Sequence, residues 1–574
     1  ILGRECFKST SLSNVDVPVG CTQIRSACFR TCSKLKTINL PQGLEYIGGG
    51  AFYQCSNLEY IDVPNTVVWR SNDSETFRDC TKLKWANIPS LTNVPPLMFY
   101  NCPAMKALCL GSSSTPVTKF ELGSHSSLYP IIICLTTANG VETDINSDYA
   151  NRGTEDNKGR FYFTKNDTKA VSTENELYVE LNDGVNDDKA ILVECYDKTI
   201  TAYNLFDIAD SGRVATQRIL NSCFQNCTSL KNIVVPEGVE RIHDWCFRDC
   251  SALEGITLPN TLNYIGSCVF MGCRALKKID IPKNVHKLYE QTFENTRNLV
   301  YVNAPGVTEV QSWRTFTSSG ITIGTFGSKE YPVEKFWFKK NAVFSDLSSL
   351  GRIVITTANG TVDDLKVGEV VEGDNTDLTE PLPDQIRIIS ENSKCVETTN
   401  ERYIEIGDDG AILIKVYDNT ITEYDLTNIG GDNRSAIEII PYVFQDFRSL
   451  VNVTMSNSLE RIGGSSFSNC ANLKEIILPS RDVKLDWSVF QNCINLKRIY
   501  NTENIVKVGE WCFGGCTKLS APLNLPKVQS IPKYVTQDSS VNIISFGSME
   551  YPVKKLEGQF ASGGYWNTFA SSGM

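Results

Sequence analysis

The chain is 574 residues long, with 41% apolar and 21% charged residues, a composition that can build a hydrophobic core and is unlike that of a disordered chain. Its formal net charge is −11 and no lysine- and arginine-rich run occurs to neutralise phosphates, so nucleic acid is not expected as a partner. No apolar run could span a bilayer and the three histidines lie far apart, so the sequence predicts no membrane span, no metal or cofactor site and no histidine-based catalysis.

The first elements in the chain belong to a repeat. Phe7, Phe29, Phe52, Phe77 and Phe99 follow spacings of 22, 23, 25 and 22 residues. Each is usually followed by a cysteine three residues later and a leucine six residues later. Later blocks keep a spacing of 23 residues without exception, with phenylalanines at Phe224, Phe247, Phe270, Phe293 and Phe316 and at Phe444, Phe467, Phe490 and Phe513.

Each repeat predicts one coil of a solenoid. In the segment LKTINL, Leu35–Leu40, Ile38 and Leu40 alternate with polar residues, which is the period of a half-buried strand. Pro41 then ends the strand, since it has no N–H to give. The A-F-x-x-C part has the spacing of one helical or 3-10 turn, which predicts a short helical return. A single repeat cannot offset its ordering entropy, so the coils must stack.

The cysteines follow the same frame. Three residues after the phenylalanine the sequence also accepts threonine, serine and phenylalanine, which a metal ligand or a disulfide partner would not tolerate. This favours a packed column of free thiols in the core over disulfides between neighbouring coils or zinc. Ten cysteines occupy this position: Cys32, Cys55, Cys80, Cys102, Cys227, Cys250, Cys273, Cys470, Cys493 and Cys516.

The frame I-G-x-x-A-F-x-x-C-x-x-L-x-x-I-x-[IL]-P resembles that of the BspA-like leucine-rich repeat family, over about 60% of the chain. The resemblance implies a curved α/β-type solenoid of leucine-rich repeats with a parallel sheet on its concave side and short helical or 3-10 returns. It also implies surface exposure and the binding of proteins, often host extracellular-matrix or plasma proteins. It carries no catalytic residues.

A second, longer period divides the chain. FGSKEYPV (Phe326–Val333) returns as FGSMEYPV (Phe546–Val553) 220 residues later. Between the repeat blocks lie β-rich spacers, in which Tyr403–Asp418 predicts a hairpin around an acidic glycine turn without calcium-ligand spacing. The spacers form either small β-modules or irregular coils that continue the stack. The predicted segments are repeat blocks 1–110, 214–320 and 434–540, spacers 111–213 and 321–433, and the start of a third spacer, 541–574.

Equivalent outward positions on stacked strands form columns, and one column predicts a ligand-binding site. Tyr60 and Trp85 should stack side by side on the concave face, flanked by Lys36, Lys84 and Lys106. Exposed aromatic residues on a rigid sheet suit protein or glycan recognition. Packing of the aromatic pair against a neighbouring loop and a solvated charge ladder are the alternatives.

Taken together, these features predict a non-enzymatic binding or adhesion protein, on the cell surface or secreted, that recognises a protein ligand such as a host matrix or plasma protein. The best-matched polar motifs recur in each long repeat, as scaffolding would, whereas an enzyme needs polar groups that converge in one place. A carbohydrate-binding or enzymatic module in the spacers and a purely structural envelope protein are the alternatives. Both ends of the chain resemble interrupted repeats, so we expect a signal peptide and an anchor outside this sequence.

Overall fold

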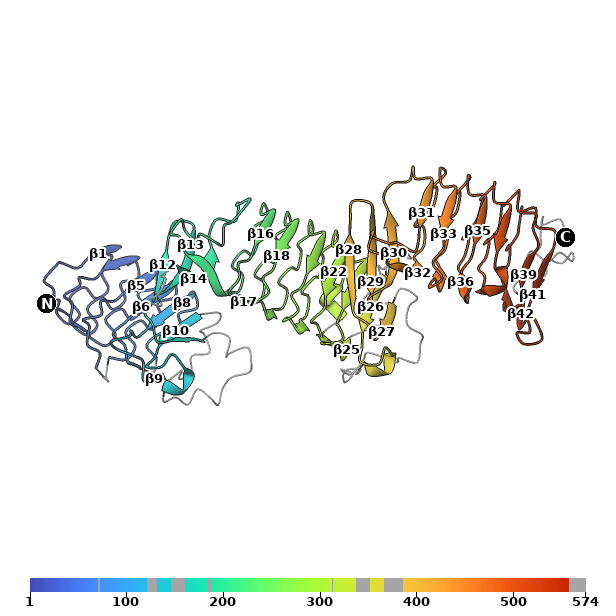
Figure 1. Ribbon diagram of the computed structural model, residues 1–574. Coiled ribbons are helices and arrows are strands. Elements are labelled where there is room, and N and C mark those ends of the chain that lie inside the picture. Colours follow the sequence, from blue (N-terminus) through green and yellow to red (C-terminus); the bar gives the residue numbers. More distant parts are fainter. Residues whose placement is uncertain are drawn as a thin grey trace. The chain divides into compact units, whose positions relative to one another are not determined.

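Short strands, most of them paired in parallel, stack coil on coil in this structure, a computed structural model (Figure 1). It describes residues 1–70, 73–95, 97–120, 132–145, 161–182, 188–311, 313–336, 352–365 and 386–556. Within these ranges there is no α-helix, and helical structure is limited to 3-10 segments such as η1 (Glu142–Asp144), η3 (Trp313–Phe316), η4 (Val362–Asp364) and η5 (Thr502–Asn504).

The chain forms two units, Ile1–Cys273 and Arg274–Met574, which are described one at a time. The boundary between them lies inside the predicted repeat block 214–320. The units therefore do not test the six segments derived from the sequence, and that division stays a prediction.

Each coil contributes two short strands to two parallel columns. In the second coil, β3 (Thr37–Asn39) pairs with β1 (Asn14–Asp16), and β4 (Tyr46–Ile47) pairs with β2 (Gln23–Ile24). The inward side chains of Ile38 and Ile47 are buried. Paired residues such as Asn14 and Thr37 lie 23 positions apart in the sequence. The predicted strand before Pro41 and the parallel sheet are thus confirmed, with the period that the phenylalanines indicate.

The return is not helical around most of the phenylalanines, and there this part of the prediction is wrong, whereas the 3-10 helix η3 (Trp313–Phe316) at Phe316 agrees with it. In the coil of Phe29, Ala27 and Thr31 take φ angles of 57° and 61°, in the left-handed region. A left-handed residue on each side of the phenylalanine interrupts any helix, leaving two consecutive turns. The Phe29 amide therefore donates to the Ala51 carbonyl oxygen of the next coil, at 2.8 Å, instead of within its own turn. The fold is a parallel β-solenoid rather than an α/β one.

The phenylalanines stack as a column through the core. From Phe7 through Phe29, Phe52 and Phe77 to Phe99, neighbouring ring centroids lie 5.3–5.6 Å apart with interplanar angles of 2–11°. The three middle rings have no exposed surface. Burial of each ring contributes about 1.5–3 kcal/mol. Because each ring is covered by the rings of the two adjacent coils, one repeat completes the core of the next.

The cysteine column is buried as expected, and it also bonds the coils to one another. The Cys55 thiol donates to the Phe29 carbonyl oxygen of the preceding coil at 3.1 Å, and Cys80 does the same to Phe52 at 3.2 Å. At the same position Thr296 donates to the Phe293 carbonyl oxygen of its own coil at 2.6 Å, and Phe447 fills the position by burial alone. All 21 cysteines are free, and Cys6 alone is exposed.

In the unit Ile1–Cys273, the predicted spacer 111–213 both continues the stack and forms a hairpin. Its strands β10 (Ile132–Thr136) and β11 (Phe161–Thr164) extend the parallel sheet in the order β11-β10-β8-β6-β5. Its later strands, β12, β13 and β14, are antiparallel, and β14 pairs in parallel with β15 of the next block. The spacer therefore continues the stack, and the alternative of a separate small β-module is not confirmed.

The remaining strands of this unit are β5 (Tyr60–Asp62), β6 (Trp85–Ile88), β7 (Asn93–Val94), β8 (Ala107–Leu110), β9 (Lys119–Phe120), β10 (Ile132–Thr136), β11 (Phe161–Thr164), β12 (Thr168–Ser172), β13 (Glu176–Leu181), β14 (Lys189–Cys195), β15 (Val214–Ile219), β16 (Asn232–Val234), β17 (Val239–Ile242), β18 (Gly255–Thr257) and β19 (Tyr264–Ile265).

The unit Arg274–Met574 repeats this plan. A parallel sheet in the order β20-β22-β24-β26-β27 is followed by the antiparallel strands β28, β29 and β30, and β30 pairs with β32, the first strand of the column β32-β34-β36-β38. The hairpin predicted over Tyr403–Asp418 is confirmed as β29 and β30.

The strands of the second unit are β20 (Lys278–Asp280), β21 (Lys287–Leu288), β22 (Tyr301–Ala304), β23 (Glu309–Val310), β24 (Ile323–Phe326), β25 (Lys335–Phe336), β26 (Arg352–Thr356), β27 (Ile386–Ile389), β28 (Ser393–Glu397), β29 (Glu401–Ile406), β30 (Gly410–Val416), β31 (Glu423–Asp425), β32 (Ser435–Ile439), β33 (Asn452–Thr454), β34 (Arg461–Ile462), β35 (Glu475–Ile477), β36 (Val483–Leu485), β37 (Arg498–Tyr500), β38 (Ile505–Lys507), β39 (Leu523–Leu525), β40 (Ser530–Ile531), β41 (Ile544–Phe546) and β42 (Lys555–Leu556).

The thiol column leads to a direct prediction. Burial raises the pKa of Cys55 and of Cys102 to about 12, so these thiols stay protonated and inert at pH 8. In a titration with a thiol-specific reagent at that pH, the exposed Cys6 should react at once and the buried cysteines only after unfolding. Rapid labelling of several thiols in the folded protein, or missing thiols after unfolding without a reductant, would contradict the buried, unpaired column.

Candidate functional site

The aromatic pair predicted from the sequence forms as expected. Tyr60 on β5 and Trp85 on β6 are register partners in the parallel sheet. Their rings stack with centroids 4.9 Å apart and an interplanar angle of 10°. The stacking of these two side chains on adjacent strands is therefore confirmed.

The expectation that this pair faces solvent is wrong for Trp85, which is only 8% exposed. Trp85 belongs to an apolar cluster with Ala170, Leu177 and Val179 of strands β12 and β13. Two positions further along the same face, Asn87 donates to the Ala170 carbonyl oxygen at 2.9 Å and accepts from its amide at 2.8 Å. The protein's own hairpin thus covers this face, which corresponds to the packing alternative.

The three lysines predicted to flank the pair differ in their surroundings. Lys36 and Lys84 are exposed, and the Lys84 Nζ lies 4.0 Å from Glu59 Oε2 and 5.5 Å from the ring centroid of Tyr196. Lys106 is partly buried, with its Nζ 4.0 Å from Glu194 Oε1 of β14. Lys84 and Lys106 therefore lie along the rim of the hairpin, and the ligand-binding role of these residues stays a prediction.

The second unit covers the equivalent column in the same way. Tyr301, which occupies the position of Trp85, is 8% exposed, and its hydroxyl donates to the Cys395 carbonyl oxygen of β28 at 2.9 Å. Where a repeat block meets the hairpin that follows it, the large outward side chain therefore packs against that hairpin.

Charged side chains converge elsewhere, on the column of β32, β34, β36 and β38. Their outward residues are in register, with Glu438 opposite Arg461, Arg461 opposite Lys484, and Lys484 opposite Lys507. Beside them lies a cleft of about 250 Å³, which we call the charged groove. It is lined by Arg352, Arg387, Glu438, Glu460, Arg461, Lys484, Asp486 and Lys507.

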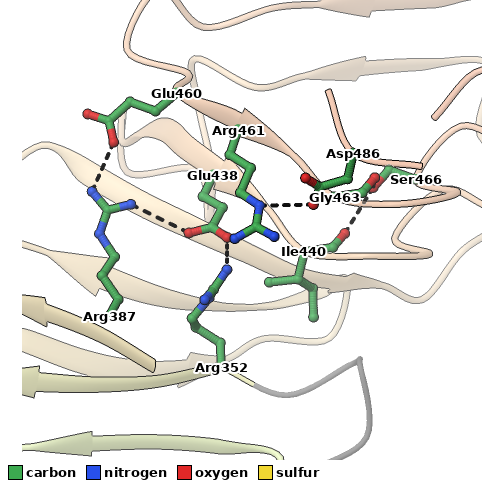
Figure 2. Close-up of polar contacts among 9 residues, drawn as sticks. All are labelled: Arg352, Arg387, Glu438, Ile440, Glu460, Arg461, Gly463, Ser466 and Asp486. Carbon is green, nitrogen blue, oxygen red and sulfur yellow. Dashed lines mark hydrogen bonds and ion pairs between the residues drawn. The ribbon is translucent and has the colours of Figure 1, made fainter. Parts of the chain in front are cut away.

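The floor of the charged groove is a buried ion pair. Arg352 of β26 contacts the Glu438 carboxylate of β32, and their side chains are only 5% and 3% exposed. Arg387 of β27 also approaches Glu438, at 3.5 Å, and bonds to Glu460 at 3.1 Å (Figure 2). Loss of one partner from a buried ion pair is strongly destabilising, because it leaves the other charge uncompensated. These residues hold the sheet of β26 and β27 against the strand column.

Beside the groove, Gly463 follows β34 and lets two coils pack closely. A Cβ atom on Gly463 would lie 2.4 Å from the Pro441 nitrogen of the preceding coil, so only glycine fits. The neighbouring Ser466 hydroxyl bonds to the Ile440 carbonyl oxygen at 2.9 Å, and Arg461 Nε lies 2.9 Å from Asp486 Oδ2 (Figure 2). Close packing of the coils thereby brings their outward charges together.

The charged groove was not predicted from the sequence, although the sequence contains part of its signal. Glu438, Arg461, Lys484 and Lys507 all stand six residues before a phenylalanine of the third block, so the repeat frame places them in one column. Arg352 lies in the predicted spacer 321–433, outside the phenylalanine frame. No local pattern showed that its strand stacks beside the column.

The fold and the groove define a class of protein, a repeat solenoid with a constant core and variable outward faces. The model of the BspA type leucine-rich repeat region matches six copies, over residues 1–125, 216–355 and 437–556. Since these matches cover more than half of the chain, the protein belongs to this family. Its repeat scaffold is typical of surface proteins and of protein binding, and the family is typically non-enzymatic.

Solved structures of leucine-rich repeat proteins are similar to this chain. A protein from Bacteroides ovatus is 17% identical, with 91% of this chain and 88% of that chain covered and a TM-score of 0.22. A leucine-rich cell surface protein from Faecalibacterium prausnitzii is 16% identical, with 67% and 96% covered and a TM-score of 0.23. The pneumococcal vaccine antigen PcpA is 19% identical, with 60% and 74% covered and a TM-score of 0.29. Likenesses at these TM-scores carry no argument about function.

None of the curated proteins compared with the chain matches it. Among the residues that the structure describes, no helix is long and apolar enough to cross a membrane.

The burial of Trp85 predicts that it is needed for stability. Trp85→Ala should lower the free energy of unfolding by about 3–5 kcal/mol, because it opens a cavity between β6 and the hairpin. Urea unfolding followed by circular dichroism measures this change. The matched control is Trp245→Ala, since Trp245 is 39% exposed and its removal should cost far less. A loss below about 1 kcal/mol for Trp85→Ala would show that the hairpin does not pack on this face.

Proposed function

We propose that this protein is a non-enzymatic binding or adhesion protein of the cell surface, or a secreted one, that recognises a protein ligand such as a host matrix or plasma protein through an extended solenoid face. Membership of a family typical of surface proteins supports the location. A solenoid offers a long, rigid face instead of a deep pocket, which suits a macromolecular ligand.

The observation that carries the proposal is the open face of the third repeat block. On β35 and β37 the inward Ile476 and Ile499 are buried, whereas the outward Glu475 and Arg498 are exposed. The inward residues stay apolar from coil to coil, and the outward ones change in charge and size. The scaffold therefore leaves these outward positions free to specify a partner.

The recurring polar motifs support a scaffold over an enzyme. In LTTANG and ITTANG the following aspartate closes the turn. Asp144 accepts hydrogen bonds from Thr137 Oγ1 at 2.8 Å and Asn139 Nδ2 at 2.7 Å, which lower its pKa to about 2. Asp364 makes the same bonds with Thr357 and Asn359. These carboxylates are engaged in turn formation and occur once in each long repeat.

On the first block, ligand contacts would fall on the exposed Lys36 and Lys84 and on the partly buried Tyr60. Trp85 and Lys106 would support them from the covered side, where the hairpin fixes their positions. This surface lies at the rim of β12–β14, so a ligand would touch both the repeat strands and the hairpin.

The proposal predicts saturable binding to at least one purified extracellular-matrix or plasma protein. Biolayer interferometry with the immobilised protein, against a panel of such proteins, measures it, and heat-unfolded protein is the control. Binding should be lost on unfolding, because the face exists only when the coils are stacked. A folded protein that binds no member of the panel but does bind a glycan array would contradict protein recognition and favour the carbohydrate-binding alternative.

A further inference from the structure

The column of β34, β36 and β38 holds three cations in a row. Arg461, Lys484 and Lys507 are register partners on consecutive parallel strands. Neighbouring strands lie about 4.8 Å apart, and like charges placed opposite each other destabilise a sheet. Lys484 and Lys507 are both exposed, and neither forms an ion pair with any of the described residues. This arrangement costs stability in the absence of a counter-charge.

A second column of the same unit shows the arrangement that stability alone would favour. On β21, β23 and β25, Lys287, Glu309 and Lys335 alternate in sign. Glu309 lies 3.3 Å from the Nζ of each lysine. The chain thus neutralises one outward column and leaves the other positive, although its overall charge is −11.

The carboxylates of the charged groove are already engaged. Glu438 is bonded by Arg352 and Arg387. Glu460 is bonded by Arg387, and Asp486 by Arg461. With five cations and three carboxylates among its lining residues, the groove keeps an excess of two positive charges, carried by Lys484 and Lys507 at its open side.

We propose that Lys484 and Lys507, together with Arg461, form a binding site for an acidic polypeptide segment of the protein partner. The partner class rests on the proposed function. The cleft of about 250 Å³ has room for one or two carboxylate side chains. Lysine and arginine bind carboxylates through charge-assisted hydrogen bonds.

The carboxylates that line the groove favour a polypeptide over a polysulfated chain. Glu460 is 43% exposed at the groove, where it would repel closely spaced sulfates. A polypeptide brings backbone N–H donors as well as carboxylates, so it can pair with Glu460 and with the lysines at once. In an extended peptide, alternate side chains point to one face, which suits carboxylates at every second residue.

The test uses a fluorescein-labelled decapeptide of alternating glutamate and serine, with the glutamine–serine peptide as the uncharged probe. Fluorescence anisotropy with the whole chain should show binding of the acidic peptide only. Lys484→Gln with Lys507→Gln should weaken it about tenfold. The matched control, Lys474→Gln with Lys497→Gln, removes two exposed lysines from neighbouring coils of the same block and should leave binding unchanged.

Stability separates a binding role from a structural one. At low salt, Lys484→Gln with Lys507→Gln should raise the urea midpoint, because it relieves repulsion within the column. A lowered midpoint would show that the lysines serve the fold and would overturn the site. If both double variants weaken peptide binding equally, the effect depends only on the net charge of the protein, and this result would also overturn the site.

Two further outcomes separate this inference from the proposed function. If matrix or plasma proteins bind but the acidic peptide does not, the acidic-polypeptide site is wrong and protein recognition stands. The same conclusion follows if Lys484 and Lys507 are needed only for binding of a heparin fragment. If the acidic peptide binds through the lysines, the site is supported even where no protein of the panel binds.

Discussion

The backbone hydrogen bonds that run from one coil to the next are the interaction on which the rest of the structure depends. Left-handed residues on both sides of most of the phenylalanines turn the amides toward the adjacent coil, as when Phe29 donates to Ala51 and Thr31 donates to Tyr53. Because an unsatisfied buried amide is costly, no coil is complete without its neighbour. The stacked phenylalanine rings and the thiols that donate to phenylalanine carbonyl oxygens also connect adjacent coils. Burial, stacking and hydrogen bonding therefore all stabilise the contact between one coil and the next.

This constraint separates scaffold from surface. Inward positions must fit the neighbouring coil and therefore repeat, whereas outward positions are free to differ. The chain uses that freedom in two ways. Beside the hairpins, outward residues such as Trp85 and Tyr301 are packing elements covered by the protein itself. On the third block, Arg461, Lys484 and Lys507 stay accessible to a partner, and the buried Arg352–Glu438 pair holds the adjoining sheet in place.

Much of the fold could be predicted, because period, strands and core depend on residues that recur at fixed spacing. The Tyr60–Trp85 stack followed from the same frame. The helical return was predicted wrongly because Phe and Cys three residues apart suit both a helical turn and two left-handed turns, and the left-handed positions hold residues such as Ala27 and Thr31 rather than a constant glycine. The cover over Trp85 and the place of Arg352 could not be predicted, since both depend on how the segments between blocks pack on the strand columns.

The measurement that tests coil-to-coil bonding most directly is hydrogen–deuterium exchange of the segments around the phenylalanines. We predict that the amides of residues 27–32 exchange as slowly as those of the strand residues 37–39, because alternate amides in the turns donate to the next coil and the others close the turns. Fast exchange of these turns, with the strands still protected, would contradict the account, because the coils would then be held together by side chains and strands alone.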